Sequence, residues 1–266
     1  LMNPPSPLPA CDVLVCESTY GNREHVRIDQ EAELAPIVRR VAARGGVIVI
    51  PAFAVGRAQA LMLHLARLRQ RGDISRVPVY LNSPMAVDAT RIYHRHHDEH
   101  HIPDEECRLM YEVATFVNSV EESKALNQQR GPMIIISASG MITGGRVLHH
   151  IAAFGADHRN AILLAGYQAG GTRGAALAQG ARTLRMFGRE VPIRAEVIQL
   201  EGFSGHADAT ELLDWIRSAP QAPRAVYVTH GEPDAADALR ARIQRELGWH
   251  ARVPEHLETI SLEAAH

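Results

Sequence analysis

The stretch 46–51, GVIVIP, determines the fold class that we expect for this chain. It consists mainly of β-branched residues and does not alternate between apolar and polar residues as a strand with one face in water does. This pattern is typical of a strand that is buried on both faces of a parallel sheet. Two further apolar runs, 133–137 (MIIIS) and 161–165 (AILLA), lie later in the chain. Segments with apolar residues at helical spacing separate these runs. Strands that alternate with helices in this way predict an α/β fold with a doubly wound, mainly parallel sheet.

The same periodicities extend the prediction outward from residues 46–51 in both directions. Residues 182–200 differ from the rest, with short alternating strands and a proline, and there we place the return of the chain to a second layer. The expected strands are 12–16, 46–51, 78–82, 133–137 and 161–165, and the expected helices are 29–43, 56–71, 84–97, 105–116, 121–129 and 142–154.

The composition limits the possible function classes. The 266 residues suffice for one large or two modest domains, and the formal net charge is −2. Nucleic-acid binding through overall basicity is thereby excluded, so such binding would need a local patch. Cys11, Cys16 and Cys107 show no CxxC spacing, which indicates a reducing compartment and predicts a cytoplasmic protein. No apolar run approaches the roughly 18 residues of a membrane span.

Three titratable residues lie just beyond expected strands. Glu17 and His230 each follow an apolar run. His206 lies in the loop 204–207 (SGHA), and the next residues, 208–211 (DATE), predict a helix that begins with an Asp N-cap and a Glu three positions later. Each residue alone is also consistent with a structural role, such as an edge-strand carboxylate or a histidine that caps a strand. Their common placement predicts a single site.

Three glycine-containing loops also follow expected strands: 51–57 (PAFAVGR), 137–146 (SASGMITGGR) and 166–174 (GYQAGGTRG). Glycines let backbone N–H groups approach an anion, and a nearby arginine can bind it with two hydrogen bonds. Such loops can also simply turn the chain of a parallel sheet. Three of them at one sheet edge favour phosphate binding. None contains a Walker A or a GxGxxG pattern.

Three motifs resemble those of a known nuclease family. Residues 17–21 (ESTYG), 203–208 (FSGHAD) and 228–232 (VTHGE) resemble motifs A, B and C of the β-CASP nucleases, members of the metallo-β-lactamase superfamily that cut RNA or DNA. The stretches PAFAVGRAQ, LNSPMA, SASGMITGGR and GYQAGGT are similar to other recurrent segments of this family, in the same order. The resemblance covers nearly the whole chain and is nearest to bacterial RNA-processing ribonucleases similar to the pre-mRNA 3′-end endonuclease.

The resemblance implies a domain organisation. Residues 1–26 would end the N-terminal half of a metallo-β-lactamase domain, residues 27–199 would form the β-CASP cap domain, and residues 200–266 would return to the metallo-β-lactamase αββα sandwich. In the family, a half that carries HxHxDH precedes ESTYG, and this chain contains no such motif. The run 94–101 (HRHHDEHH) comes near to it but continues an expected helix, so its side chains would fan around the helix axis.

The resemblance also implies a chemistry. The function would be zinc-dependent hydrolysis of single-stranded RNA, with two zinc ions, in a cleft between the two domains. Glu17 and His206 would be catalytic: His206 would donate a proton to the leaving 3′ oxygen, and Glu17 would orient it. His230 would ligate zinc, and a histidine at this position is typical of the RNA-cutting members. Because it is the one expected zinc ligand present, the chain alone should supply at most one ligand residue and be inactive.

The same resemblance predicts RNA or phosphate contacts in the motif loops. Many relatives carry an arginine where this chain has Ala175, and we expect Arg173 to compensate. The predicted contacts are Thr19, Arg57, Ser83, Ser139, Gly140, Arg146, Tyr167, Gln168, Thr172 and Arg173.

Two other function classes stay open. The chain could belong to a non-catalytic RNA-binding or scaffold subunit, because the family contains members that have lost metal ligands. The presence of both Glu17 and His206 favours an enzyme. It could also be an unrelated α/β domain that binds a nucleotide, but it lacks the Walker lysine and a ribose-binding acid. A two-fold homodimer is the default assembly.

Overall fold

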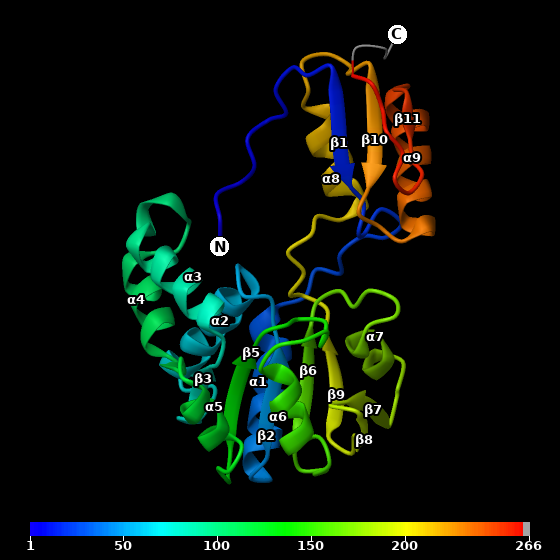
Figure 1. The fold of residues 1–266 in the computed structure, drawn as a ribbon. Coiled ribbons are helices and arrows are strands. Elements are labelled where there is room, and N and C mark those ends of the chain that lie inside the picture. Colours follow the sequence, from blue (N-terminus) through cyan, green and yellow to red (C-terminus); the bar gives the residue numbers. More distant parts are fainter. Residues whose placement is uncertain (263–266) are drawn as a thin grey trace. The chain divides into compact units, whose positions relative to one another are not determined.

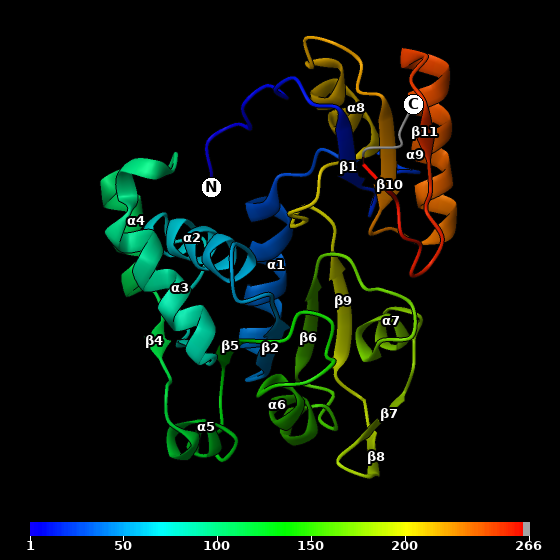
Figure 2. The same cartoon turned by 45° about the horizontal axis from the view of Figure 1, so that its top comes forward.

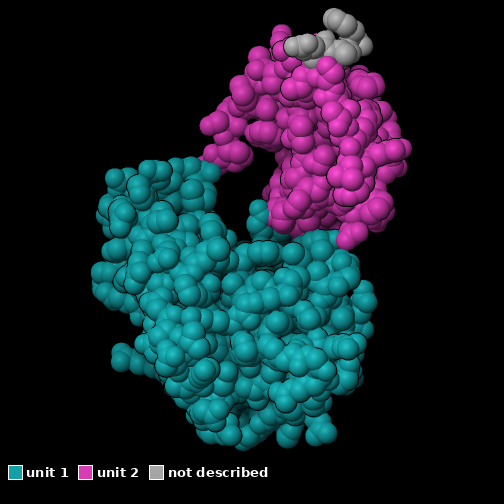
Figure 3. All heavy atoms as spheres, in the orientation of Figure 1, with its two compact units in different colours: residues 1–3, 27–205 teal, residues 4–26, 206–266 magenta. Residues whose placement is uncertain are grey.

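The protein is described here by a computed structural model, in which residues 1–262 are defined. The chain divides into two compact units, one formed by residues 1–3 and 27–205 and the other by residues 4–26 with the chain from His206 onward (Figure 3). The two units share no sheet and no hydrophobic core. Within residues 1–262, no helix is long and apolar enough to cross a membrane.

A six-stranded parallel sheet organises the larger unit (Figure 1). Its strand order is β4-β3-β5-β2-β6-β9. The three central strands are buried along their whole length, as their apolar sequences predict. The strands are β2 (Val47–Pro51), β3 (Val79–Leu81), β4 (Thr115–Phe116), β5 (Met133–Ser137), β6 (Ala161–Ala165) and β9 (Glu196–Leu200).

Successive residues of the central strands enter two different cores. Ile48 and Ile50 pack into one core with helices α1 and α2, whereas Val47 and Val49 pack into the other with helix α6. Side chains alternate between the faces of a strand, so a strand between two helical layers needs apolar residues at every position. The helices are α1 (Gln30–Ala43), α2 (Arg57–Gln70), α3 (Pro84–Arg95), α4 (Asp104–Glu112), α5 (Val120–Leu126), α6 (Val147–Phe154) and α7 (Arg173–Ala178), with a 3-10 turn at His97–Glu99.

Residues 182–200 do not form a second layer, and that prediction was wrong. Strand β9 pairs in parallel with β6 and extends the same sheet. The strands β7 (Thr183–Met186) and β8 (Arg189–Pro192) form an antiparallel hairpin. Partial exposure of β9 explains the error, because an edge strand carries polar residues even when its sheet is otherwise buried.

Helices α4 and α6 differ most from their predicted bounds. Helix α4 ends at Glu112, and Thr115–Phe116 form edge strand β4 next to β3. Helix α6 begins at Val147 rather than Ile142. The reason is Gly145, which has a φ of +78° and lies so close to Ala138 that a β-carbon would be 2.5 Å from that residue's carbonyl oxygen. The chain therefore folds back on itself here before the helix starts.

The smaller unit is built on a three-stranded parallel sheet with the order β1-β10-β11 (Figure 2). Leu14 and Cys16 of β1 and Val226 and Val228 of β10 point into its core, where they meet helices α8 and α9. The elements are β1 (Val13–Glu17), α8 (Ala209–Arg217), β10 (Ala225–Thr229), α9 (Pro233–Leu247) and β11 (Ala251–Arg252).

A buried polar cluster in the larger unit joins the segments that follow β3 and β5. The Asn82 amide donates to His150 Nε2 over 2.7 Å and to Ser123 Oγ over 2.8 Å, and His150 Nδ1 donates to Asn127 Oδ1 over 2.7 Å. Arg146 donates to Asn82 Oδ1 over 2.8 Å. Burial, reinforced by the neighbouring His149 and by the positive charge of Arg146, lowers the pKa of His150 to about 4. The imidazole is therefore neutral, with one nitrogen donating and the other accepting.

We predict that His150 makes the protein sensitive to mild acid. Between pH 6.5 and pH 4 the unfolded chain binds a proton on this residue that the folded protein does not, so the free energy of unfolding falls as the pH drops. The slope contributed by one such group is at most about 1.4 kcal/mol per pH unit. Urea unfolding of the wild type and His150→Gln at several pH values measures it.

The substitution should flatten the pH dependence in this window. His158→Gln is the control, because the side chain of His158 is 86% exposed. Equal pH slopes for the wild type and His150→Gln would contradict the assignment.

Candidate active site

The parallel pairing of β1 with β10 brings two loops to one edge of the smaller sheet. The register pairs Glu17 with Thr229, so His230 begins its loop directly beside the end of β1. Ser18 Oγ donates to the Thr229 carbonyl oxygen over 2.7 Å. Position 231 requires glycine, because a β-carbon on Gly231 would lie 2.4 Å from Ser18 Oγ. The two loops are therefore held in direct contact.

The backbone at His206 is held by the start of helix α8 and by His25. The Asp208 carboxylate accepts hydrogen bonds from the backbone N–H groups of Thr210 and Glu211, and the Glu211 carboxylate accepts one from the Asp208 N–H. This arrangement confirms the predicted N-cap. Asp208 Oδ2 also accepts from the His25 N–H over 2.9 Å, and His25 Nε2 donates to the His206 carbonyl oxygen over 2.8 Å.

The charge of Asp208 is set by these donors. Burial opposes ionisation of its carboxyl group, but hydrogen bonds from the N–H groups of Glu211, His25 and Thr210 outweigh burial and lower its pKa. An ionised carboxylate is the stronger acceptor and is also favoured at a helix N-terminus. Sequence reasoning identified Asp208 as a cap but missed His25, which carries no local signal because its partner lies 181 residues away.

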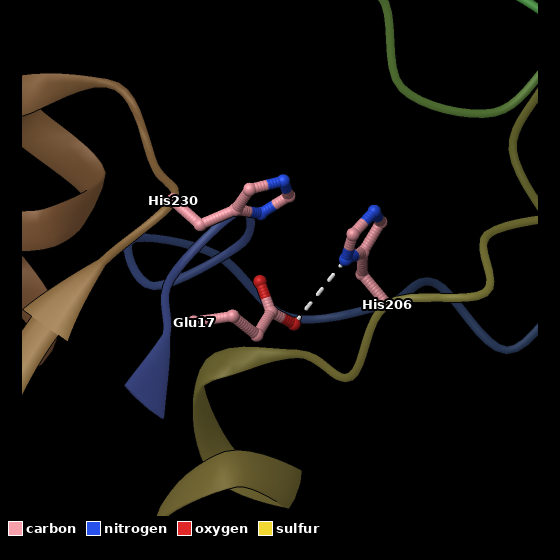
Figure 4. A group of neighbouring side chains, drawn as sticks. All are labelled: Glu17, His206 and His230. Carbon is pink, nitrogen blue, oxygen red and sulfur yellow. Dashed lines mark ion pairs between the residues drawn. The ribbon is translucent and has the colours of Figure 1, made fainter. Parts of the chain in front are cut away.

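Glu17, His206 and His230 converge as predicted. Only Glu17 and His230 lie at strand ends of one sheet, however, because His206 lies between β9, which belongs to the other sheet, and helix α8. The three side chains point toward one another in Figure 4, with His206 Nδ1 3.3 Å from Glu17 Oε1. The ring centroids of His206 and His230 are 5.7 Å apart. The second oxygen of Glu17 accepts from the Thr19 N–H over 2.7 Å. The carboxylate is thus fixed on one side by the backbone and faces a histidine on the other.

The tautomer of His230 follows from its contacts with Thr19. The Thr19 hydroxyl donates to the His230 carbonyl oxygen over 3.1 Å and lies 3.3 Å from Nδ1 of the same residue. With the single hydroxyl proton donated to the carbonyl oxygen, Nδ1–H donates to the hydroxyl oxygen, and a neutral ring then carries its lone pair on Nε2. His230 also has a φ of +54°, a conformation that residues other than glycine seldom adopt. The backbone of His230 is therefore held in an uncommon conformation at the residue whose ring is a candidate metal ligand.

The donor atoms of these three residues suit a transition metal. One carboxylate oxygen and two imidazole nitrogens lie within 4.8 Å of one another, and among residues 1–262 no other such group of metal-binding side chains occurs. Nitrogen and carboxylate oxygen are ligands that zinc accepts. Cys16 does not add a thiolate, because burial and the neighbouring Glu17 charge raise the pKa of its thiol to about 12. His230 is the best-prepared ligand, since Nδ1 of His206 already faces Glu17.

The ten predicted RNA contacts divide between the two units. Thr19 lies in the smaller unit beside Glu17 and His230. The other nine follow β2, β3, β5 and β6, which are neighbours in one parallel sheet, so their loops share its carboxyl edge as predicted. Gln168 of the third loop reaches the second, where its amide donates to the Gly140 carbonyl oxygen over 3.2 Å.

The polar side chains of these loops also hold the loops themselves. Arg57 is 8% exposed and donates to the Ala165 carbonyl oxygen. Arg146 donates to the carbonyl oxygens of residues 117 and 118, and Arg173 donates to those of residues 142, 143 and 185. Ser83 caps α3, Thr172 caps α7, and Ser139 Oγ accepts from the N–H groups of residues 143 and 144. Contact of these residues, and of Tyr167, with RNA stays a prediction.

The histidine run 94–101 does not form a metal-binding cluster. Helix α3 ends at Arg95, and the run continues as a 3-10 turn. His97 faces Asp104 over 3.0 Å, whereas His100 is buried and stacks on Tyr93 with ring centroids 5.9 Å apart. His94 Nδ1 and His100 Nε2 lie 4.0 and 3.9 Å from Cys107 Sγ, but within residues 1–262 the run contributes to no close group of three metal-binding side chains.

Two family models match the chain. A Beta-Casp domain matches residues 58–177, and a Zn-dependent metallo-hydrolase RNA specificity domain matches residues 190–254. The first match lies wholly within the larger unit, and the second contains His206 and His230.

Curated relatives agree with these domains. The chain is 38% identical to Ribonuclease TTHA0252 of Thermus thermophilus over 242 residues, which are 88% of this chain and 55% of the relative. It is 32% identical over 271 residues to Transcription termination factor FttA of Methanosarcina mazei and 33% identical over 269 residues to FttA of Pyrococcus abyssi, in each case 96% of this chain and 42% or 41% of the relative. The chain spans about half the length of the curated relatives it matches. Two matching domains and these relatives show that the chain belongs to the β-CASP family of the metallo-β-lactamase superfamily.

Proposed function

We propose that this chain is part of a zinc-dependent ribonuclease that hydrolyses phosphodiester bonds of RNA. The convergence of Glu17, His206 and His230 within 4.8 Å carries the proposal. The match to a Zn-dependent metallo-hydrolase RNA specificity domain and the similarity to a protein named a ribonuclease support zinc as the metal and RNA as the substrate. In the complete protein we propose two zinc ions, with His230 Nε2 as one ligand.

His206 is the proposed general acid. Its Nδ1 faces the Glu17 carboxylate, so Nε2 is the nitrogen that delivers a proton to the leaving 3′ oxygen. Glu17 orients the ring and stabilises its positive charge, while the Thr19 N–H holds the other carboxylate oxygen. Zinc, when bound, supplies the Lewis acidity that activates water and neutralises charge on the phosphate. The hydrogen bond from His25 to the His206 carbonyl oxygen fixes the backbone that presents the acid.

The loops of the larger unit, together with Thr19 of the smaller unit, are the proposed RNA-binding surface. We assign the larger unit to the β-CASP cap and the smaller unit to part of the metallo-β-lactamase domain, in agreement with the position of the Beta-Casp match. The proposed contacts are Thr19, Arg57, Ser83, Ser139, Gly140, Arg146, Tyr167, Gln168, Thr172 and Arg173.

We further propose a cytoplasmic location and a homodimeric assembly for the protein. Cys11, Cys16 and Cys107 are free thiols, which supports a reducing, cytoplasmic location. We propose a two-fold homodimer, the commonest arrangement of soluble oligomers. Light scattering coupled to size-exclusion chromatography of the full-length gene product tests this assembly.

We predict that His206→Ala lowers RNA cleavage by about 10²-fold or more, because a positioned general acid contributes roughly 10²–10⁴-fold. Cleavage of end-labelled single-stranded RNA by the full-length gene product, with and without a chelator, measures the effect. His158→Ala is the matched control, since its side chain is 86% exposed. RNA affinity should be nearly unchanged in both variants.

A zinc-loaded wild type that binds RNA without cutting it would contradict this function. That result would favour the other candidate, a non-catalytic RNA-binding subunit. Undiminished cleavage by His206→Ala would leave the ribonuclease standing and remove His206 as its acid.

We predict that Glu17→Gln lowers cleavage by about 10–100-fold, the usual cost of losing a group that orients a reactive side chain. The amide oxygen can still accept from His206 Nδ1, but it cannot stabilise a charged ring. The rate of cleavage at saturating RNA measures the loss, and Glu190→Gln, at an exposed position of β8, is the control. An unchanged rate would show that the charge of Glu17 is not needed.

A further inference from the structure

An exposed aromatic ring lies among the glycine loops of the larger unit. Phe53 follows β2 and is 41% exposed, and it belongs to neither core of this unit. Phe187, the other exposed phenylalanine of the described chain, is stacked on His149 with ring centroids 4.6 Å apart. Within residues 1–262 no ring covers Phe53 in this way. Exposure of an aromatic ring costs hydrophobic free energy, so a ligand that covers it gains affinity.

Phe53 is seated on Gly140. A β-carbon built on this glycine would lie 2.9 Å from Cδ2 and 3.0 Å from Cε2 of Phe53, so one edge of the ring packs where any other residue would carry a side chain. The backbone of the Phe53 loop is also fixed. The Ala52 N–H donates to the Ser137 carbonyl oxygen over 3.0 Å, and the Phe53 carbonyl oxygen accepts from the Ala58 N–H over 3.3 Å. The ring is thus a rigid, preorganised surface.

Other exposed apolar residues and predicted phosphate contacts lie at the same sheet edge as Phe53. Val55, two residues later, is 63% exposed, and Met85, after the nearby strand β3, is 68% exposed. Strand β5 lies between β2 and β3 in the sheet (Figure 1), so the loop of Val55 and the first turn of helix α3, which contains Met85, flank the loop of Ser139 and Gly140 at the carboxyl edge. A nucleotide has a matching character, with an apolar aromatic base beside an anionic phosphate.

We propose that Phe53 is a stacking surface for one base of the bound RNA, and that Gly140 is a glycine because it seats this ring. The inference rests on the proposed function, because it specifies how the same RNA is held. A stacking contact tolerates any base, since every base has an aromatic face. Phe53 therefore contributes affinity and position along the strand without selecting a sequence.

The test is RNA binding by the full-length gene product in a His206→Ala background, in which the RNA stays intact. Phe53→Ala should weaken binding of a single-stranded 12-mer by about 5- to 150-fold, the range expected for loss of one base–aromatic stack. Phe53→Trp should retain the affinity, and Phe187→Ala should leave it unchanged. Phe53→Leu fills a similar volume without an aromatic face, so it should weaken binding even if Phe53→Ala fails to fold.

Abasic substitutions, scanned one at a time along the 12-mer, distinguish stacking from a structural role. At one position, loss of the base should weaken binding to the parent but not to Phe53→Leu or Phe53→Ala, because the lost interaction is already absent. A parent that binds RNA with the same affinity as the Phe53 variants overturns this inference alone. A parent that binds no RNA overturns the proposed function together with it.

Discussion

The candidate site depends on the hydrogen-bonded register between β1 and β10. Pairing of Glu17 with Thr229 places a carboxylate and His230, which are more than 200 residues apart, at the end of two adjacent parallel strands. A slip of one residue would move every side chain of β1 to the opposite face of the sheet. Leu14 and Cys16 would then leave the core, so burial of these residues fixes the position of Glu17. The apolar core and the polar site are two consequences of one register.

In the larger unit, too, the pairing of parallel strands determines which loops lie together. Strands β3, β5, β2 and β6 are parallel, so the loops that follow them share an edge whatever their order in the chain. The buried side chains of His150 and Asn82 are hydrogen-bonded to each other. Asn82 Oδ1 also accepts a hydrogen bond from Arg146, which lies in the loop after β5. Neutral His150 is suited to this position because it donates through one nitrogen and accepts through the other. The polar cluster therefore connects the rigid sheet to the loops.

Those features of the fold that depend on local chemistry were predictable from the sequence. The strands 133–137 and 161–165 were predicted to the residue, because burial on both faces leaves an uninterrupted apolar run. The cap at Asp208 was also predictable, since a capping box lies within four residues. The layer of β9 was not, because this partly exposed edge strand lacks the uninterrupted apolar run of the buried strands. The candidate site shows the same contrast. The convergence of Glu17, His206 and His230 was predicted from their positions next to expected strands, whereas the hydrogen bond from His25 to His206 could be identified only in the folded structure.

The arginines show why residue type alone does not define a binding surface. Arg57, Arg146 and Arg173 all donate to backbone carbonyl oxygens of their own unit. These hydrogen bonds from arginine to the backbone are compatible with anion binding. A carbonyl oxygen that faced a phosphate would repel it, and a guanidinium bound to that oxygen offsets its negative partial charge and keeps positive charge in the loop. Arginine suits both tasks because its five N–H donors lie in a fixed plane, so some can hold the loop in the arrangement that a phosphate requires. A surface of this kind is built before its ligand arrives, which lowers the entropic cost of binding.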